Sequence, residues 1–448
     1  MQLFAVQELI LKVCGFLPLS PDRYTLNSPR TRTLQYVLQT SLTFVAVCLL
    51  LGSFYDTVVH TVAVLYVFLQ TTLEDPTARP SKSYKPDLLG VLSNLPFCAI
   101  HLRGLLVLYL FFRQRYNWSI LKFELDRVIA KCLPVQSDPK DAVKKWTKIS
   151  FFLSVFTFSL HTIWEIVEVV YYLAKEPENY GTYTKVFDPL PFKIRTDEYL
   201  TIYQLFCTIP YILSQQIYTL LIVPSGVLYE SIDLLLNDIR NAQYGHAEIT
   251  TVSGRWQRTL ELSDTVDEWA DRYRAIVEFV ERLNESFSWI LFAAYGLDFI
   301  TVLGFAAGMA SGAKELKGFF FLLTCATIFA SYGTAYLIPM VKLHEKSLEL
   351  PFALRQLRAN VKMLASEGFL DRDERFAERE ELLSKLDFLQ ATTHRHPCAV
   401  DAAEVFYITR EVLVRTVTLN VSLVVLIKQL IMDKDDKHDV VRTSTLSV

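Results

Sequence analysis

The amino-acid sequence predicts an all-α integral membrane protein. It is expected to be a bundle of seven transmembrane helices with inverted topology: N-terminus cytosolic, C-terminus outside, and long cytosolic helical extensions. Three observations lead to this fold class. About half of the 448 residues are hydrophobic (51%). They gather in runs of about 20, the length that spans a bilayer as a helix. The charged stretches between the runs repeat apolar residues at helical spacing.

Composition argues against several classes of function. The net charge of −3 and the lack of a basic patch with interleaved aromatics argue against nucleic-acid binding. No Cys/His cluster has metal-ligand spacing and no catalytic cluster is evident, so no metal, cofactor or enzymatic activity is expected. The lipid bilayer is the partner that the hydropathy predicts.

Residues 1–35 are predicted to form a cytosolic amphipathic segment rather than a cleaved signal peptide. The stretch MQLFAVQELILKVCGFLPL lacks a basic start and a small-residue cleavage site, and Glu8 and Lys12 interrupt its apolar run. A helix of this kind is expected to lie at the cytosolic face of the membrane.

Residues 36–343 are predicted to hold six spans and the cytosolic helical loops that join them. The apolar runs place the spans at 36–56, 88–112, 149–173, 199–224, 287–310 and 318–341, with a seventh at 412–431. A further apolar piece at 58–71 is too short to cross alone; were it a span, the count would be eight.

The orientation follows from the loops. With the N-terminus inside, the cytosolic segments carry more than twice as many Lys and Arg residues as the outer ones, as the positive-inside rule requires. All seven cysteines then fall in spans or in cytosolic parts, where disulfides do not form. The sequons at Asn117 and Asn284 lie inside, and the third, at Asn420, lies in the membrane.

The predicted cytosolic loops themselves have helical periodicity. Apolar side chains recur every three or four residues in GVLYESIDLLLNDIRNA and in DTVDEWADRYRAIVEFVERLN, and again within 344–401. We expect 344–401 to form cytosolic anchor helices that pack with extensions of the spans. Two roles fit this pattern equally: joining subunits, or covering one another within a monomer.

The seventh span carries a polar stripe along one face. At 100° per residue, its members fall within an arc of about 80°. They are Glu411, Arg415, Thr418, Ser422, Leu426, Gln429 and Asp433. Polar groups facing lipid would be costly, whereas a stripe that lines water is tolerated. Glu411 and Arg415 also form a favourable i,i+4 pair. The alternative is a helix in mid-bundle whose polar groups bond to neighbouring helices.

A pore is favoured because the polarity runs the whole length of the span. One helix cannot enclose a pore, so the stripe predicts a symmetric oligomer with 402–431 as its lining. Leu426 and neighbouring Leu430 would form an apolar constriction, and Gln429 a polar ring beside it. Asp433, which opens the predicted extracellular tail 432–448, would favour cations.

Several stretches resemble the insect gustatory and odorant receptor superfamily, and most closely its gustatory-receptor-like members. The family's seventh span ends in Thr-Tyr, five hydrophobic residues and Gln-Phe; here SLVVLIKQL matches it at Gln429, with Ser422 for the Thr, and departs from it at Lys428. The stretches AAEVFYITREVLVRTV, LILKVCGFLPLSP and LNESFSWILFAAYGLDFI are also family-like.

The resemblance implies a gustatory-type receptor of the plasma membrane that acts as a ligand-gated, non-selective cation channel. It implies a homo- or hetero-tetramer of related subunits, with the seventh helices around the pore and the anchor helices joining the subunits. It also implies a small, tastant-like ligand bound between helices in the outer half of the bundle.

Polar and aromatic residues at that depth are the candidate ligand contacts, since intramembrane ionisable groups are functional candidates. They are Trp164, Glu165, Glu168, Tyr171, Tyr203, Gln204, Asp298, Thr301 and His101. Glu165 and Asp298 stand out because each lies in an apolar run without an adjacent opposite charge. The alternative is that these residues form interfacial belts or serve packing, as His101 with Arg103 could.

Two other functions remain open. The chain could be an inverted seven-span receptor that signals through a partner without conducting, which packing of the polar stripe inside one subunit would favour. The second alternative to a channel is a transporter or membrane enzyme, but the sequence contains no internal repeat or pair of broken helices to support it.

Overall fold

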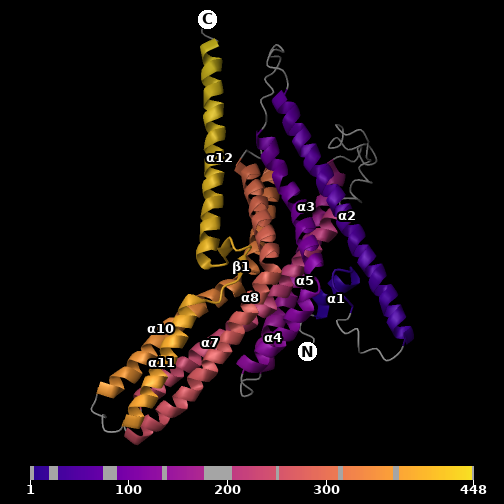
Figure 1. Cartoon of the computed structure of the whole chain (residues 1–448). Coiled ribbons are helices and arrows are strands. Elements are labelled where there is room, and N and C mark those ends of the chain that lie inside the picture. The colour runs from indigo at the N-terminus through magenta and orange to yellow at the C-terminus, as the bar shows by residue number, and fades with distance from the viewer. Residues whose placement is uncertain are drawn as a thin grey trace.

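The computed structural model describes residues 5–19, 29–73, 88–133, 139–175, 204–248, 252–310, 316–366 and 373–445. In these ranges the chain is almost entirely helical (Figure 1). The helices are α1 (Ala5–Val13), α2 (Pro29–Leu73), α3 (Leu88–Gln114), α4 (Asn117–Cys132), α5 (Pro139–Lys175), α7 (Ile209–Glu248), α8 (Val252–Ala310), α9 (Leu316–Ala335), α10 (Ile338–Ser366), α11 (Asp373–Arg395) and α12 (Arg410–Thr445). A π-helical turn, η3 (Gln204–Thr208), precedes α7, and strands β1 (Asp401–Ala402) and β2 (Phe406–Tyr407) form an antiparallel pair before α12.

Helix α2 joins the predicted first span and the apolar piece at 58–71 into one helix of 45 residues. The eight-span alternative is therefore wrong, because no turn separates 36–56 from 58–71. The junction, DTVVHT, contains neither Gly nor Pro, and the side chains of Asp56 and His60 are buried against the bundle. Their polarity marks a packed face of a helix rather than a helix end.

Five helical stretches in the described part of the chain have the length and hydropathy of a membrane span. They are Thr33–Val62, Leu95–Gln114, Leu205–Gln243, Glu261–Met309 and Leu322–Met363. These overlap the predicted first, second, fourth, fifth and sixth spans. The predicted third and seventh spans lie in α5 and α12, parts of whose side chains fall outside the described residues.

The predicted sixth span, 318–341, is divided between two helices. Helix α9 ends at Ala335 and α10 begins at Ile338, with a turn between them. Pro339 follows at once in the first turn of α10, where a missing N–H costs nothing but where it cannot continue the hydrogen bonding of α9.

The long extensions of α7, α8, α10 and α11 pack together at the end of the molecule away from the C-terminus (Figure 1). The apolar stripes found in the sequence are buried here within one chain. Val227, Leu228, Trp269, Tyr273 and Ile276 are each at most 2% exposed. These apolar stripes therefore cover one another within a single subunit. Any role in joining subunits would be additional to this packing.

Helix α1 forms as the sequence predicts, but its polar side faces the protein. Glu8 is 7% exposed and accepts hydrogen bonds from Trp118 Nε1 at 3.1 Å and from Lys122 Nζ at 2.8 Å. Leu9 and Val13 are about 60% exposed on the other side (60% and 58%). The amphipathic pattern is therefore satisfied by a buried ionic contact with α4, not by polar groups turned to solvent.

Candidate functional site

The segment between α11 and α12 docks firmly on α8. Tyr273 donates a hydrogen bond to the carbonyl of His396 at 2.6 Å. The Asn284 side chain makes two bonds, donating to Ala399 O at 3.0 Å and accepting from Asp401 N at 3.1 Å. These contacts hold the start of α12 in a fixed position on the extension of α8.

This docking also bears on the Asn284 sequon. The nitrogen that would carry a glycan donates to Ala399 O, so glycosylation would break a contact between α8 and the segment before α12. Asn117 lies at the first position of α4 and Asn420 within α12.

Helix α12 begins at a capped end and touches the rest of the chain along one face. The hydroxyl of Thr409 accepts from Val412 N at 3.3 Å, satisfying one of the free N–H groups of the first turn. Further along, Leu413 packs against the main hydrophobic core, and Thr416 Oγ1 lies 2.5 Å from Tyr295 Oη of α8. Tyr295 also contacts Phe406 of β2, with ring centroids 5.6 Å apart.

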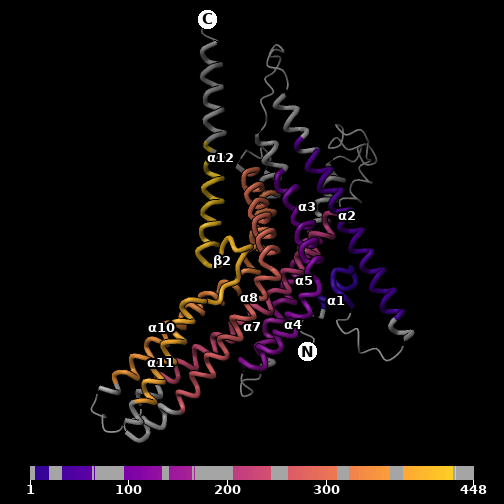
Figure 2. The backbone as a smooth tube through the Cα atoms, viewed as in Figure 1, coloured from indigo at the N-terminus to yellow at the C-terminus, as the bar shows by residue number. Residues whose placement is uncertain are grey.

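The polar stripe of α12 lies on the other side of that helix. At roughly 100° per residue, Leu413 and Thr416 point about 120–180° away from the centre of the stripe. The described members of the stripe are all exposed: Glu411, Arg415, Thr418, Ser422, Leu426 and Gln429. Figures 1 and 2 show α12 running along the outside of the bundle, with its N-terminal end on the β-strand pair.

Within the stripe, Arg415 forms an ion pair with Glu411, as the i,i+4 spacing predicts. Exposed apolar side chains lie to one side of the stripe: Val414, Val421 and Val417 point roughly 80°, 100° and 140° from its centre and are 56%, 59% and 57% exposed. The side chains of Leu430, Asp433 and Lys428 lie outside the described residues, although α12 itself continues past the predicted end at 431 to Thr445.

A polar cavity of about 390 Å³ lies where α8 and the segment before α12 meet. Its lining includes Glu281, Arg395, His396, Asp401 and Glu404. Burial raises the pKa of the Asp401 carboxyl, and the nearby negative charge of Glu404 raises it further. The hydrogen bond that Asp401 accepts from the backbone N–H of Glu404 lowers this pKa in part. Asp401 is therefore protonated at a higher pH than a solvated aspartate.

Among the ligand candidates, Asp298 has no opposite charge beside it in the sequence, but in the fold it pairs with a charge from another helix. Its Oδ1 lies 2.5 Å from Nε of Arg103, a residue with no solvent exposure. Arg103 also donates to Ser214 Oγ at 2.5 Å and lies over the rings of Tyr211 and Tyr218, 4.9 and 5.3 Å from their centroids. The pairing joins α3, α7 and α8, and the spans involved are too far apart in sequence for local spacing to show it.

His101 and Thr301 are buried in the same part of the bundle. The Thr301 hydroxyl donates to Leu297 O of its own helix at 2.8 Å. His101 Nδ1 lies 2.6 Å from Asp56 Oδ2, and its ring stacks on that of His60 with centroids 4.3 Å apart. Both ligand candidates therefore have partners within the protein.

The remaining candidates cannot be placed in the site. Tyr203 lies outside the described residues, and the side chains of Trp164, Glu165, Glu168, Tyr171 and Gln204 are likewise not described, although α5 and η3 carry them.

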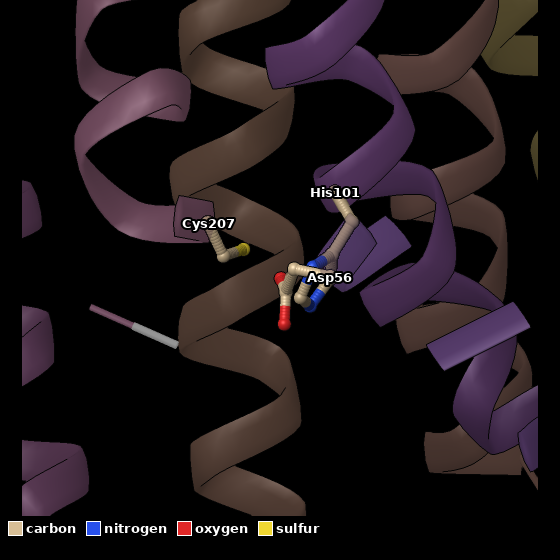
Figure 3. A group of neighbouring side chains, drawn as sticks. All are labelled: Asp56, His101 and Cys207. Atoms are coloured by element: carbon tan, nitrogen blue, oxygen red, sulfur yellow. The ribbon is translucent and has the colours of Figure 1, made fainter. Parts of the chain in front are cut away.

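The structure also brings together a group that the sequence did not reveal. Asp56, His101 and Cys207 come from α2, α3 and η3, and they point toward one another (Figure 3). Each offers one ligand atom, and these atoms lie within 4.8 Å of one another. The sequence analysis considered spacing along the chain only, and it could not find this group because its members come from three separate elements.

Arg103 is the functional candidate that sequence reasoning undervalued most. The rule that singled out Asp298, an ionisable group within an apolar run, applies equally to Arg103. Asn284, whose amide fixes the segment before α12, gave no signal beyond its sequon.

The fold defines a multi-pass helical membrane protein, and the described part of the polar face of α12 is exposed. Residues 104–429 match the model of the family described as 7tm chemosensory receptor. The chain belongs to this family of receptors, which confirms the resemblance seen in the sequence and the expectation that it is not an enzyme.

Solved structures show the same fold. The insect olfactory receptor OR5 from Machilis hrabei superposes with a TM-score of 0.61 at 14% identity, covering 96% of this chain and 100% of that one. The same receptor in complex with eugenol gives 0.62 at 12% identity, covering 95% and 97%. No curated protein matches the sequence.

Proposed function

We propose that this chemosensory receptor is a ligand-gated, non-selective cation channel in which the α12 helices of four subunits surround the pore. The observation that carries the proposal is the exposure of the whole described polar stripe on the side of α12 turned away from α8. A polar stripe exposed within the membrane needs water or another subunit beside it.

The apolar flanks of α12 support an oligomer around that stripe. Exposed Val414, Val417 and Val421 give neighbouring copies an apolar surface to pack on while the polar arc faces an axis. Leu426, which is 50% exposed, supplies the constriction and Gln429 the polar ring beside it. Glu411 neutralises Arg415, so the pairing removes much of a cationic ring's repulsion of permeant cations.

The contacts at the base of α12 support a route for gating. Tyr295 and Asn284 tie α12 and its preceding segment to α8, so movement of α8 on ligand binding is transmitted directly to the pore helix. The proposed ligand is a small molecule held between helices of the bundle. The structure of OR5 in complex with eugenol supports a ligand of this size, since that receptor has the same fold.

The gustatory type, the plasma membrane and the orientation belong to the same proposal. Gln429 in SLVVLIKQL supports the gustatory type, and the distribution of Lys and Arg supports a cytosolic N-terminus and an outer C-terminus. Epitope tags at the two termini, stained with and without permeabilisation, test the orientation: a tag at the N-terminus that stains without permeabilisation contradicts it.

The pore is tested by substituted-cysteine accessibility in liposomes containing the purified protein, with eugenol as the first stimulus and sugars and bitter compounds as further ones. A cationic thiol reagent should block cation flux through Ser422→Cys. It should leave Val421→Cys unaffected, the matched control one position away on the apolar flank. Native mass spectrometry should find four copies.

Three results would count against the channel. Equal block of the Ser422→Cys and Val421→Cys variants would mean that the polar stripe does not line the pore. A monomer in native mass spectrometry would mean that there is no symmetry axis for a pore to follow. Specific binding of a stimulus without any flux supports the alternative, a receptor that signals through a partner.

A further inference from the structure

We infer that Asp56, His101 and Cys207 form a binding site for a transition-metal ion of the Zn²⁺ type, which clamps α2, α3 and η3 together inside the bundle. The three residues are all buried: His101 is 1% exposed, Cys207 2% and Asp56 3%. Their ligand atoms lie within 4.8 Å of one another and point to a common centre (Figure 3).

The backbone is shaped to bring these groups together. Gly52 lies one helical turn before Asp56 on α2, and a Cβ built there would lie 2.0 Å from the ring of Phe206. Only glycine permits this approach, which places η3, and with it Cys207, against the Asp56 face of α2. Cys207 also sits on a π-helical turn, a distortion found frequently at functional sites.

The ligand set has the chemistry that Zn²⁺ prefers. Thiolate, imidazole and carboxylate are its usual donors, and three protein ligands leave a fourth position for water or another group. An ionised Asp56, a Cys207 thiolate and a neutral His101 together carry two negative charges, which a divalent cation balances. The loaded site is then neutral, which suits a region where an unbalanced charge is costly.

Binding requires small, defined changes. Tetrahedral Zn²⁺ ligands stand roughly 3.2–3.7 Å apart, so the 2.6 Å separation of Asp56 Oδ2 and His101 Nδ1 must widen by roughly 0.6–1.1 Å. Cys207 loses its thiol proton, and the proton shared by Asp56 and His101 also leaves. His60, stacked on His101 at 4.3 Å, fixes the plane of the ring during this exchange.

The site is tested by metal binding to the purified full chain, carrying an affinity tag without histidines. After treatment with a chelator, the protein is titrated with Co²⁺, whose thiolate ligation gives a charge-transfer band, and Zn²⁺ is counted by mass spectrometry after dialysis. We expect one Zn²⁺ per chain, a thiolate–Co²⁺ band, and displacement of Co²⁺ by Zn²⁺.

Cys207→Ser and Cys325→Ser form a matched pair, because both thiols are buried in the same apolar cluster and only Cys207 belongs to the site. Cys207→Ser should abolish the band and weaken Zn²⁺ binding at least roughly tenfold, whereas Cys325→Ser should keep both. Asp56→Asn should weaken binding while retaining the band at high Co²⁺.

The unsubstituted protein keeps the inference falsifiable if a variant does not fold. Zn²⁺ should raise its melting temperature as a ligand specific to the folded state does. Absence of bound metal in the unsubstituted protein, metal without a thiolate band, or loss of the band in both cysteine variants would each overturn the site. None of these measurements depends on ion flux, so they stand apart from the channel proposal.

Discussion

The buried ion pair between Arg103 and Asp298 makes a quantitative prediction about the bundle. We consider Arg103→Met, Asp298→Leu and the double variant. Each single substitution leaves one charge without its partner at a site where Arg103 has no exposure and Asp298 is 6% exposed. Breaking a buried pair from one side costs about 3–5 kcal/mol, because the remaining charge stays desolvated and unpaired.

The double variant should lose much less than the two single losses added together. It removes both charges and replaces them with apolar groups of similar size, a change that is often close to neutral. The hydroxyl of Ser214 keeps its own bond to Tyr211 O at 2.6 Å, so removing Arg103 does not leave it without a partner. We expect a coupling free energy of about 2 kcal/mol or more between the two positions.

The assay is thermal unfolding of the detergent-solubilised protein, followed by size-exclusion chromatography of heated samples. With an unfolding entropy of about 2.1 cal/mol/K per residue, a loss of 3–5 kcal/mol lowers the melting temperature of this chain by about 3–5 °C. Scan rates must be matched between variants, since membrane proteins often unfold irreversibly. Additive shifts, or single variants as stable as the parent, would refute the reasoning.

Three further predictions concern other parts of the fold. Gly226→Ala should lower the melting temperature, because the new Cβ would lie 2.1 Å from the Trp146 ring and such overpacking costs about 1–3 kcal/mol; Gly296→Ala, with nothing within 4 Å, is the control that should not. Burial lowers the pKa of His344, so the unfolded chain binds the extra proton as pH falls through about 6.5; stability should fall between pH 7.5 and 5.5, and by less in His344→Gln. Burial raises the pKa of Cys398 to about 12, so peptide mass spectrometry should find this thiol unalkylated by iodoacetamide at pH 8 until the protein is denatured; rapid labelling of the native protein would contradict its placement.

The local pattern of hydropathy and helical spacing in the sequence predicted where the helices lie well, but predicted their ends less well. Apolar runs located every span that the structure describes, since hydropathy and helical period are properties of neighbouring residues. The predicted ends of helices were wrong where packing against the rest of the bundle outweighed the local sequence pattern. The first span was predicted to end at Asp56, yet α2 continues to Leu73, and the bundle buries the polar side chains of Asp56 and His60.

The α12 stripe shows how far one helix can be understood alone. The wheel placed Glu411, Arg415, Ser422 and Gln429 on one face, and the Glu411–Arg415 pair followed from its spacing. Which way that face points could not be read from the sequence, because it depends on how Tyr295 and Leu413 seat α12 on α8.

The sequence by itself determined the class of protein, its membrane-spanning helices, its family and the polar character of the last helix. Only the tertiary structure decided that the stripe is exposed, that Asp298 pairs with Arg103, and that Asp56, His101 and Cys207 meet. The physical reason is the separation along the chain over which each kind of interaction acts. Hydropathy and periodicity act between residues a few positions apart, whereas charge pairing and ligand geometry depend on the register between helices far apart in the chain.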